Sequence, residues 1–165
     1  MIAVEIREAD FDVGAEYNHI KESATGAGAV VFFVGLVRDL YVADDPTETV
    51  DYIELQHYSG MTETLCEQIC REAADRFSVE HIRVVHRVGK LKGGDQIVFV
   101  ASASPHRKSA FDAAQYVMDY LKTRATLWKK EVGTRGDNWV GMKSSDKEAV
   151  VRWQTPESAP RKPIG

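Results

Sequence analysis

The sequence lacks any apolar run close to the ~20 residues that a membrane-spanning helix requires. Its first residues, MIAVEIREAD, also lack the basic-then-apolar pattern that marks a signal peptide. We therefore predict a cytoplasmic protein that does not associate with membranes.

Cysteine is scarce, with only Cys66 and Cys70 among 165 residues. In a helical pattern, residues four apart face the same side, so these two thiols should lie together. No further cysteine or histidine stands at a spacing that would complete a four-ligand zinc site, and the spacing differs from the C-x-x-C of redox motifs. We interpret both as small core residues and predict neither a metal site nor a bound cofactor.

Positive charge is not in excess, because 21 Lys and Arg stand against 25 Asp and Glu, a formal net charge of -4. Domains that bind nucleic acids through bulk electrostatics are usually clearly basic, so we predict no nucleic-acid partner. A hydrophobic share of 44% fits one compact domain, which we place at residues 1–153. Three of the five prolines fall in residues 154–165, which we predict to be a disordered tail.

Hydrophobic periodicity divides the domain into strands and helices. Nearly continuous apolar residues from Gly28 to Arg38 predict a central strand covered on both faces. An apolar residue at every fourth position from Met61 to Phe77 predicts an amphipathic helix lying on a sheet. Further strands are predicted at residues 2–6, 50–58, 80–89, 95–104, 126–133 and 138–143, and further helices at residues 12–24, 106–122 and 145–153.

The order of these elements decides the fold class. Strands and helices do not follow a strict β-α-β rhythm, so we predict an α+β fold with a mostly antiparallel sheet. Gly93 and Gly94 in the segment KLKGG supply the positive φ values of a tight hairpin between residues 80–89 and 95–104. Pro105 stands at a position suited to a helix start.

The helix at residues 106–122 carries basic side chains at both ends. At ~1.5 Å per helical residue, Arg107 and Lys122 lie more than ~20 Å apart, too far for one small molecule to touch both within a single chain. Either the chain has two anion sites, or two chains share one.

Around the end of this helix, Lys122, Arg124, Lys129 and Lys130 place four positive charges within nine residues. Crowded cations destabilise one another, so the pKa of a lysine here should fall and leave some neutral amine to act as a nucleophile or base. Attraction of basic residues to a helix C-terminus is the alternative explanation. In an extended segment Lys129 and Lys130 point to opposite faces, and Lys129 shares its face with Glu131.

His106 and Arg107 stand at the predicted start of the helix, where free backbone N–H groups favour a bound phosphate or carboxylate. Arg38 ends the apolar strand, and strand ends are places where binding sites are built. Taken alone, each of these residues is more often a solvated surface residue.

Four separated segments together resemble the catalytic (large) subunit family of molybdopterin synthase: GAVVFFVGLVRD, LQHYSGMTE, VVHRVGKLKGGDQIVFVASASPHRKSAFDA and MDYLKTRATLWKKE. The resemblance spans roughly residues 2–153, and the segments occur in the family's order. It implies an α/β-hammerhead fold with packed helices and a small added β subdomain.

The resemblance also implies an activity and partners. The family converts cyclic pyranopterin monophosphate (precursor Z) to molybdopterin, in molybdenum cofactor biosynthesis, by installing two sulfurs as a dithiolene. The sulfur comes from the thiocarboxylated C-terminal Gly-Gly of a small ubiquitin-like subunit. Two large subunits form a homodimer within a heterotetramer, and the family's pocket takes its His-Arg pair from one subunit and its lysines from the other.

Specific residues carry these implied roles. Lys122 and Lys129 match the family's two catalytic lysines. The residues that match its substrate-binding positions are Leu36, Val37, Arg38, His106, Arg107, Lys122, Lys129, Lys130 and Glu131. The shared pocket agrees with the separation of the two helix ends, which was inferred without it.

The chain departs from the family's pattern at Leu36, where a polar residue is frequent, at Thr126, where proline is frequent, at Pro105 and in the acidic loop at residues 44–48. An alternative function is a non-catalytic anion-binding or scaffold protein of the same fold. Single-stranded RNA binding would require aromatic stacking platforms that the sequence does not identify.

Overall fold

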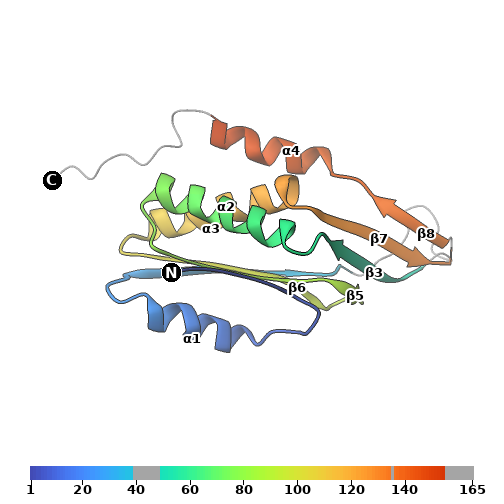
Figure 1. Cartoon of the computed structure of the whole chain (residues 1–165), viewed down its shortest axis with the longest axis horizontal. Coiled ribbons are helices and arrows are strands. Elements are labelled where there is room, and N and C mark those ends of the chain that lie inside the picture. The colour runs from blue at the N-terminus through green and yellow to red at the C-terminus, as the bar shows by residue number, and fades with distance from the viewer. Residues whose placement is uncertain (39–48, 135, 155–165) are drawn as a thin grey trace.

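The computed structural model describes residues 1–38, 49–134 and 136–154, and within them the chain forms two four-stranded sheets (Figure 1). The first sheet has the order β1 (Ile2–Arg7), β4 (His81–Arg87), β6 (Gln96–Ser104), β2 (Ala29–Leu36). Its β1 and β4 are parallel, and its other neighbours are antiparallel. The second sheet is antiparallel, in the order β5 (Gly89–Leu91), β3 (Val50–His57), β7 (Leu127–Gly133), β8 (Gly136–Val140).

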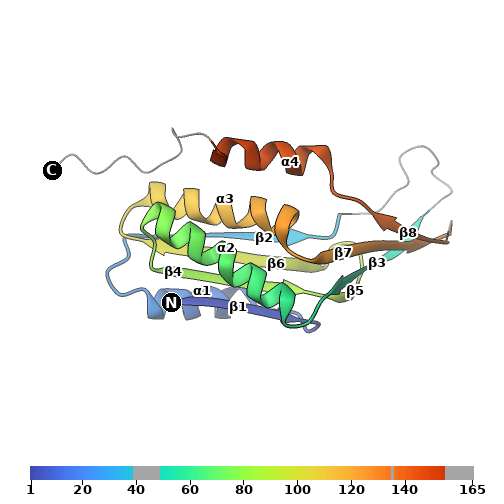
Figure 2. The same ribbon diagram turned by 45° about the horizontal axis from the view of Figure 1, so that its top comes forward.

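Helices cover both faces of the first sheet. Figure 2 shows α2 (Met61–Phe77) and α3 (Arg107–Arg124) side by side on one face and α1 (Val13–Ser23) on the other. The last helix, α4 (Ser144–Val151), and the 3-10 turn Arg152–Gln154 follow the second sheet and pack beside α3. No helix in the described part of the chain is long and apolar enough to cross a membrane. The predicted α+β fold is confirmed, and β3, β5, β7 and β8 form the added β subdomain.

The main core lies between the first sheet and the α2–α3 layer. Cys66 and Cys70 are fully buried there as free thiols, and burial raises the pKa of the Cys66 thiol to about 12. Their predicted place as small core residues is confirmed. The described residues contain no group of three or more His, Cys, Asp or Glu side chains that could hold a metal ion.

The strand predicted at residues 28–38 was expected at the centre of a sheet, and this was wrong. β2 lies at the edge of the first sheet, next to β6. Phe32 and Phe33 are each 45% exposed and Leu36 is 54% exposed. An uninterrupted apolar run indicates that both faces of a strand are covered. It does not indicate whether the covering residues belong to the same chain or to another one.

Two smaller predictions also need correction. The segment expected as a simple hairpin contains β5, which leaves the first sheet and pairs with β3. The tight turn is therefore confined to residues 92–95. Of Gly93 and Gly94, only Gly94 has a positive φ, at 85°. Ile69, Ala73 and Phe77 of the predicted stripe on α2 are buried, but at the start of the helix Met61 is exposed and Thr62 is fully buried in its place. The predicted tail at residues 154–165 and the acidic loop at residues 44–48 lie outside the described residues, apart from Gln154.

Candidate active site

Lys129 lies at the centre of a cluster of charges on β7. It pairs in register with the buried Leu55 of β3, and its Nζ lies 3.7 Å from Oε1 of Glu131. Burial lowers the pKa of Lys129; Glu131 opposes this, whereas the nearby cations Lys143 and Arg38 lower the pKa further. The amine is thus half-buried among other cations, and a neutral form is more accessible to it than to a solvated lysine.

Lys130 points to the opposite face of β7, as the alternation predicts. Its Nζ lies 3.1 Å from Asp137 and 3.4 Å from Glu54, and 5.7 Å from the ring centre of Trp139. The hydrogen bond with Asp137 raises the pKa of Lys130. The structure therefore does not bring the two adjacent ammonium groups to the same pocket.

Lys122 occupies the last turn of α3 and is 54% exposed along its side chain. Its Nζ lies 3.6 Å from Oδ1 of Asp146, in the first turn of α4. Arg124, two residues further on, forms a bidentate pair with Glu72 of α2 and leaves the site. Of the four clustered cations, Lys122 and Lys129 alone remain as candidates for chemistry.

The turn that joins Lys122 to Lys129 is fixed by a threonine pair. The buried hydroxyl of Thr62 donates to the carbonyl of Thr126 at 3.1 Å and lies 2.8 Å from the Thr126 hydroxyl. The same Thr62 oxygen accepts from the backbone N–H of Tyr58 at 3.0 Å. Thr126 therefore ties this turn to the start of α2.

The end of β2 supplies the third part of the site. Val37 is buried among Ile53, Leu55 and Leu91, and its backbone N–H donates to the carbonyl of Asp95 at 2.8 Å. Leu36 and Arg38, on either side of it, are exposed. Val37 thus anchors the end of β2 and leaves Leu36 and Arg38 at the surface. Arg38 is near enough to Lys129 to lower the pKa of that lysine.

His106 and Arg107 lie at the other end of α3. Both are exposed; His106 is the N-cap and Arg107 the first helical residue, so Pro105 stands just outside the helix. The helix runs without interruption to Arg124, so at ~1.5 Å per residue Arg107 is more than ~20 Å from Lys122. The structure brings Arg38, Lys122, Lys129 and Glu131 together where α3 ends and β7 begins, and leaves the His-Arg pair at the other end of α3.

Two charged residues at this site were missed from the sequence, Lys143 and Asp146. The predicted helix at residues 145–153 includes Asp146, but an acid in a first helical turn is explained by the helix dipole alone. Lys143 was predicted at the end of the strand at residues 138–143, whereas it is the N-cap of α4. Only the packing of α4 against α3 places these side chains beside Lys129 and Lys122, and no local pattern encodes that contact.

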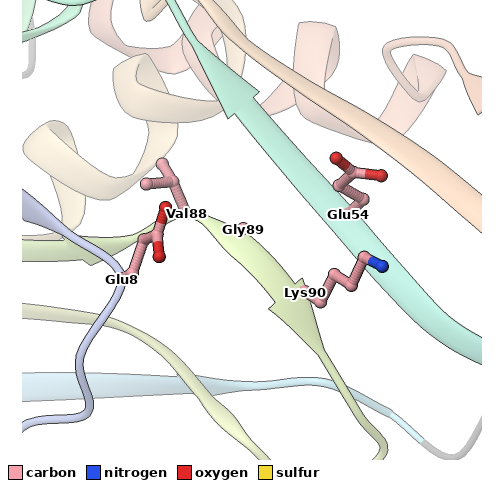
Figure 3. Close-up of a pocket in the computed structure, with 5 residues that line it drawn as sticks. All are labelled: Glu8, Glu54, Val88, Gly89 and Lys90. Carbon is pink, nitrogen blue, oxygen red and sulfur yellow. The ribbon is translucent and has the colours of Figure 1, made fainter.

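A separate cavity of about 450 Å³ lies at the junction of the two sheets (Figure 3). Glu8, Glu54, Val88, Gly89 and Lys90 line it. Glu54 contacts Lys130 across the strands, so this lining residue lies on the outer face of the second sheet, opposite to Lys129. None of the basic residues predicted for the site is among those lining residues.

Known proteins resemble this chain over nearly its whole length. The family model described as MoaE protein matches residues 6–124. The molybdopterin synthase catalytic subunit of Pseudomonas aeruginosa is 46% identical over 153 residues, which cover 93% of this chain and 99% of that protein. The solved structure of the molybdopterin biosynthesis MoaE protein from Burkholderia ambifaria has a TM-score of 0.80 and 42% identity, with coverage of 94% of this chain and 99% of that one.

A more distant solved structure is the protein–protein complex of subunits 1 and 2 of molybdopterin-converting factor from Helicobacter pylori. It covers 86% of this chain and 92% of the matched chain, with a TM-score of 0.69 and 21% identity, and shares the fold. The family match and the close relatives agree with the resemblance inferred from the four sequence segments. The chain belongs to the MoaE family, whose matched relatives are catalytic subunits of molybdopterin synthase.

Proposed function

We propose that the chain transfers sulfur to cyclic pyranopterin monophosphate, forming molybdopterin, with Lys122 and Lys129 as its catalytic residues. The observation that carries the assignment of these residues is their position near the C-terminal end of α3, with Arg38 and Lys143 beside Lys129. A phosphorylated substrate requires such cations, and so does an oxyanion that develops when a carbonyl is attacked.

The two lysines suit a reaction that moves protons and negative charge. A half-buried amine with a lowered pKa, as at Lys129, can exchange a proton near neutral pH. Arg38 adds a bidentate donor suited to phosphate, and Glu131 orients Lys129 across 3.7 Å. Leu36 is an exposed part of the rim and the buried Val37 anchors it, whereas Lys130 lies on the outer face of the strand and contributes positive charge there.

The proposed sulfur donor is a small ubiquitin-like subunit with a C-terminal Gly-Gly thiocarboxylate. The complex of two subunits in the Helicobacter pylori structure supports a small protein partner for this fold. We further propose a cytoplasmic location, without a nucleic-acid or membrane partner.

We propose that the active form contains two copies of this chain, which pair through β2. This strand lies at a sheet edge with Phe32 and Phe33 exposed, an arrangement that invites a further strand. Its start lies beside the start of α3, since the N–H of Gly28 donates to the carbonyl of Ser104 at 3.1 Å and a Cβ on Gly28 would lie 2.5 Å from the carbonyl oxygen of Pro105. Its other end leads to Arg38.

Antiparallel pairing of two β2 strands would place the start of each opposite the end of the other. His106 and Arg107 of one copy would then approach Arg38, Lys122 and Lys129 of its partner. The long separation along α3 becomes a requirement of the assembly, because each copy contributes its two ends to two different sites.

The assignment of Lys122 is tested by a coupled assay with precursor and the thiocarboxylated small subunit. We expect Lys122→Ala to lower the rate of molybdopterin formation by ~100-fold or more, the usual size of a proton-transfer or charge-stabilising contribution. Lys21→Ala, on α1 across the sheet, is the matched control and should retain the wild-type rate. An unchanged rate in Lys122→Ala would remove Lys122 from the mechanism, and binding without turnover by the wild type would support a non-catalytic scaffold.

A further inference from the structure

The first turn of α4 contacts the end of α3 that carries Lys122. Asp146 lies three residues into this turn, and its backbone N–H donates to the carbonyl of Lys143 at 3.1 Å. Its carboxylate lies 3.6 Å from Nζ of Lys122, with 20% of the Asp146 side chain exposed. Lys143, the N-cap of the same helix, is near enough to Lys129 to lower its pKa. One short segment thus presents an anion to one proposed catalytic lysine and a cation to the other.

The far end of α4 is fastened to the same helix. Oδ2 of Asp119, in α3, accepts hydrogen bonds from Nη2 of Arg152 at 2.7 Å and from Nε1 of Trp153 at 2.8 Å. Trp153 is 6% exposed and packs edge-on against Phe77 and Tyr116. A buried indole therefore holds the segment that follows α4 in place.

Asp119 and Lys122 stand three residues apart on α3, so they lie on the same face of that helix. Both bind residues from the α4 segment, one at each end of it. The contact between Lys122 and Asp146 is therefore part of a two-point attachment and does not depend on one flexible surface pair.

Stability alone gives a weak reason for the pair. A solvent-exposed ion pair contributes little to folding stability, and an acid in a first helical turn gains a similarly small amount from the helix dipole. Lysine has a long side chain, and fixing its rotamers costs conformational entropy. A carboxylate held in place on α4 can order the Lys122 side chain before the substrate binds.

We infer that Asp146 is a positioning residue, which holds the Lys122 ammonium at the site from its 3.6 Å contact on the anchored α4 segment. This role rests on the proposed function of Lys122. Asp146 does not touch the substrate in this account, and it acts only by reducing the number of orientations that Lys122 can adopt.

The test replaces the carboxylate with a neutral group of the same shape, in Asp146→Asn. Full-length protein with the small subunit and precursor should show kcat reduced about tenfold, the factor for losing roughly 1.4 kcal/mol of pre-ordering. KM for the phosphorylated precursor should stay unchanged or fall, since an anion has been removed near an anionic substrate. Asp146→Glu, which restores the charge, should recover part of the lost kcat.

Positioning is read separately by NMR of reductively 13C-methylated protein, with the Lys122 signal identified by its loss in Lys122→Arg. Asp146→Asn should move this signal without lowering the melting temperature by more than about 3 °C, the shift expected on loss of an exposed pair. The control is Glu67→Gln, which removes the carboxylate from another exposed pair, 3.0 Å from Arg71 on α2. It should alter neither the signal nor kcat.

An unmoved Lys122 signal in Asp146→Asn would show that the pair does not order the lysine, and unchanged kcat with a moved signal would show that the ordering does not serve the reaction. Either result overturns the role of Asp146 while leaving the proposed function intact. An inactive wild type, in contrast, would overturn the proposed function and this role with it.

Discussion

Two inactive variants of this chain should restore activity when they are combined in one dimer. The perturbations are His106→Ala and Lys122→Ala, at opposite ends of α3 and more than ~20 Å apart in one chain. Each variant forms dimers in which both sites lack one group, so each homodimer should be inactive.

The size of the recovery follows from the two-fold geometry. In a heterodimer, one site combines both mutated groups and the other combines both intact groups, so a purified heterodimer should reach about half of the wild-type rate. After equal mixing and random exchange, half of the dimers are heterodimers, and total activity should be about one quarter of the wild-type rate. Differently tagged chains allow the heterodimer to be purified and its composition verified before the coupled assay.

A second heterodimer provides the opposite expectation and therefore the control. It joins a wild-type chain to a chain that carries both substitutions. If the pocket is shared, each of its two sites lacks one group and it should be inactive; if each chain contains a whole site, it should keep about half of the wild-type rate. Activity in this second heterodimer together with none in the first would refute the shared pocket.

Two further predictions concern the edge strand and acid stability. Phe33→Lys places a charge on the exposed edge of β2, so light scattering should show a shift from dimer to monomer, accompanied by loss of activity. The control Tyr58→Lys, at a side chain that is 63% exposed near the start of α2, should change neither. A stable Phe33→Lys dimer would contradict pairing through β2. A hydrogen bond from Arg83 lowers the pKa of Glu5, and a hydrogen bond from Arg124 lowers the pKa of Glu72. Both carboxylates therefore stabilise the folded state above their unfolded pKa near 4.5. This stability is lost as the pH falls through the lower pKa values of the folded state. The urea midpoint should therefore drop below about pH 4.5, and Glu72→Gln should reduce that dependence; an equal acid dependence in this variant would contradict the assignment.

The elements of the fold were predictable because local patterns determine them. The alternation of β1, the apolar face of α3 and the hairpin of β7 and β8 each follow from neighbouring residues. The same alternation separated Lys129 from Lys130 before their contacts were known. A prediction of this kind needs only the geometry of a strand.

The rest depended on contacts between distant segments. Arg124 leaves the site because Glu72 of α2 lies within bonding distance, and Lys122 gains Asp146 because α4 packs on α3. The edge position of β2 depends on the order of strands in the sheet. An apolar run of this kind is expected both for a central strand and for an edge strand that another chain covers, so the sequence does not distinguish the two positions. None of these contacts between distant segments can be predicted from the sequence around Arg124, Lys122 or β2.

The lengths of β2 and α3 explain why a shared pocket is geometrically possible. Both begin near Gly28 and Pro105 and both end near the basic cluster, so they run in the same direction. Eight strand residues at ~3.4 Å span about 27 Å, and 18 helical residues at ~1.5 Å also span about 27 Å. Antiparallel pairing of two β2 strands in full register would therefore offset the two α3 helices by very little along the strand direction. The start of each helix would lie level with the end of the other, which is the condition for His106 of one copy and Lys122 of its partner to face one ligand. A slip by two residues would displace the ends by about 7 Å, more than a side chain can recover and still bind the same small molecule.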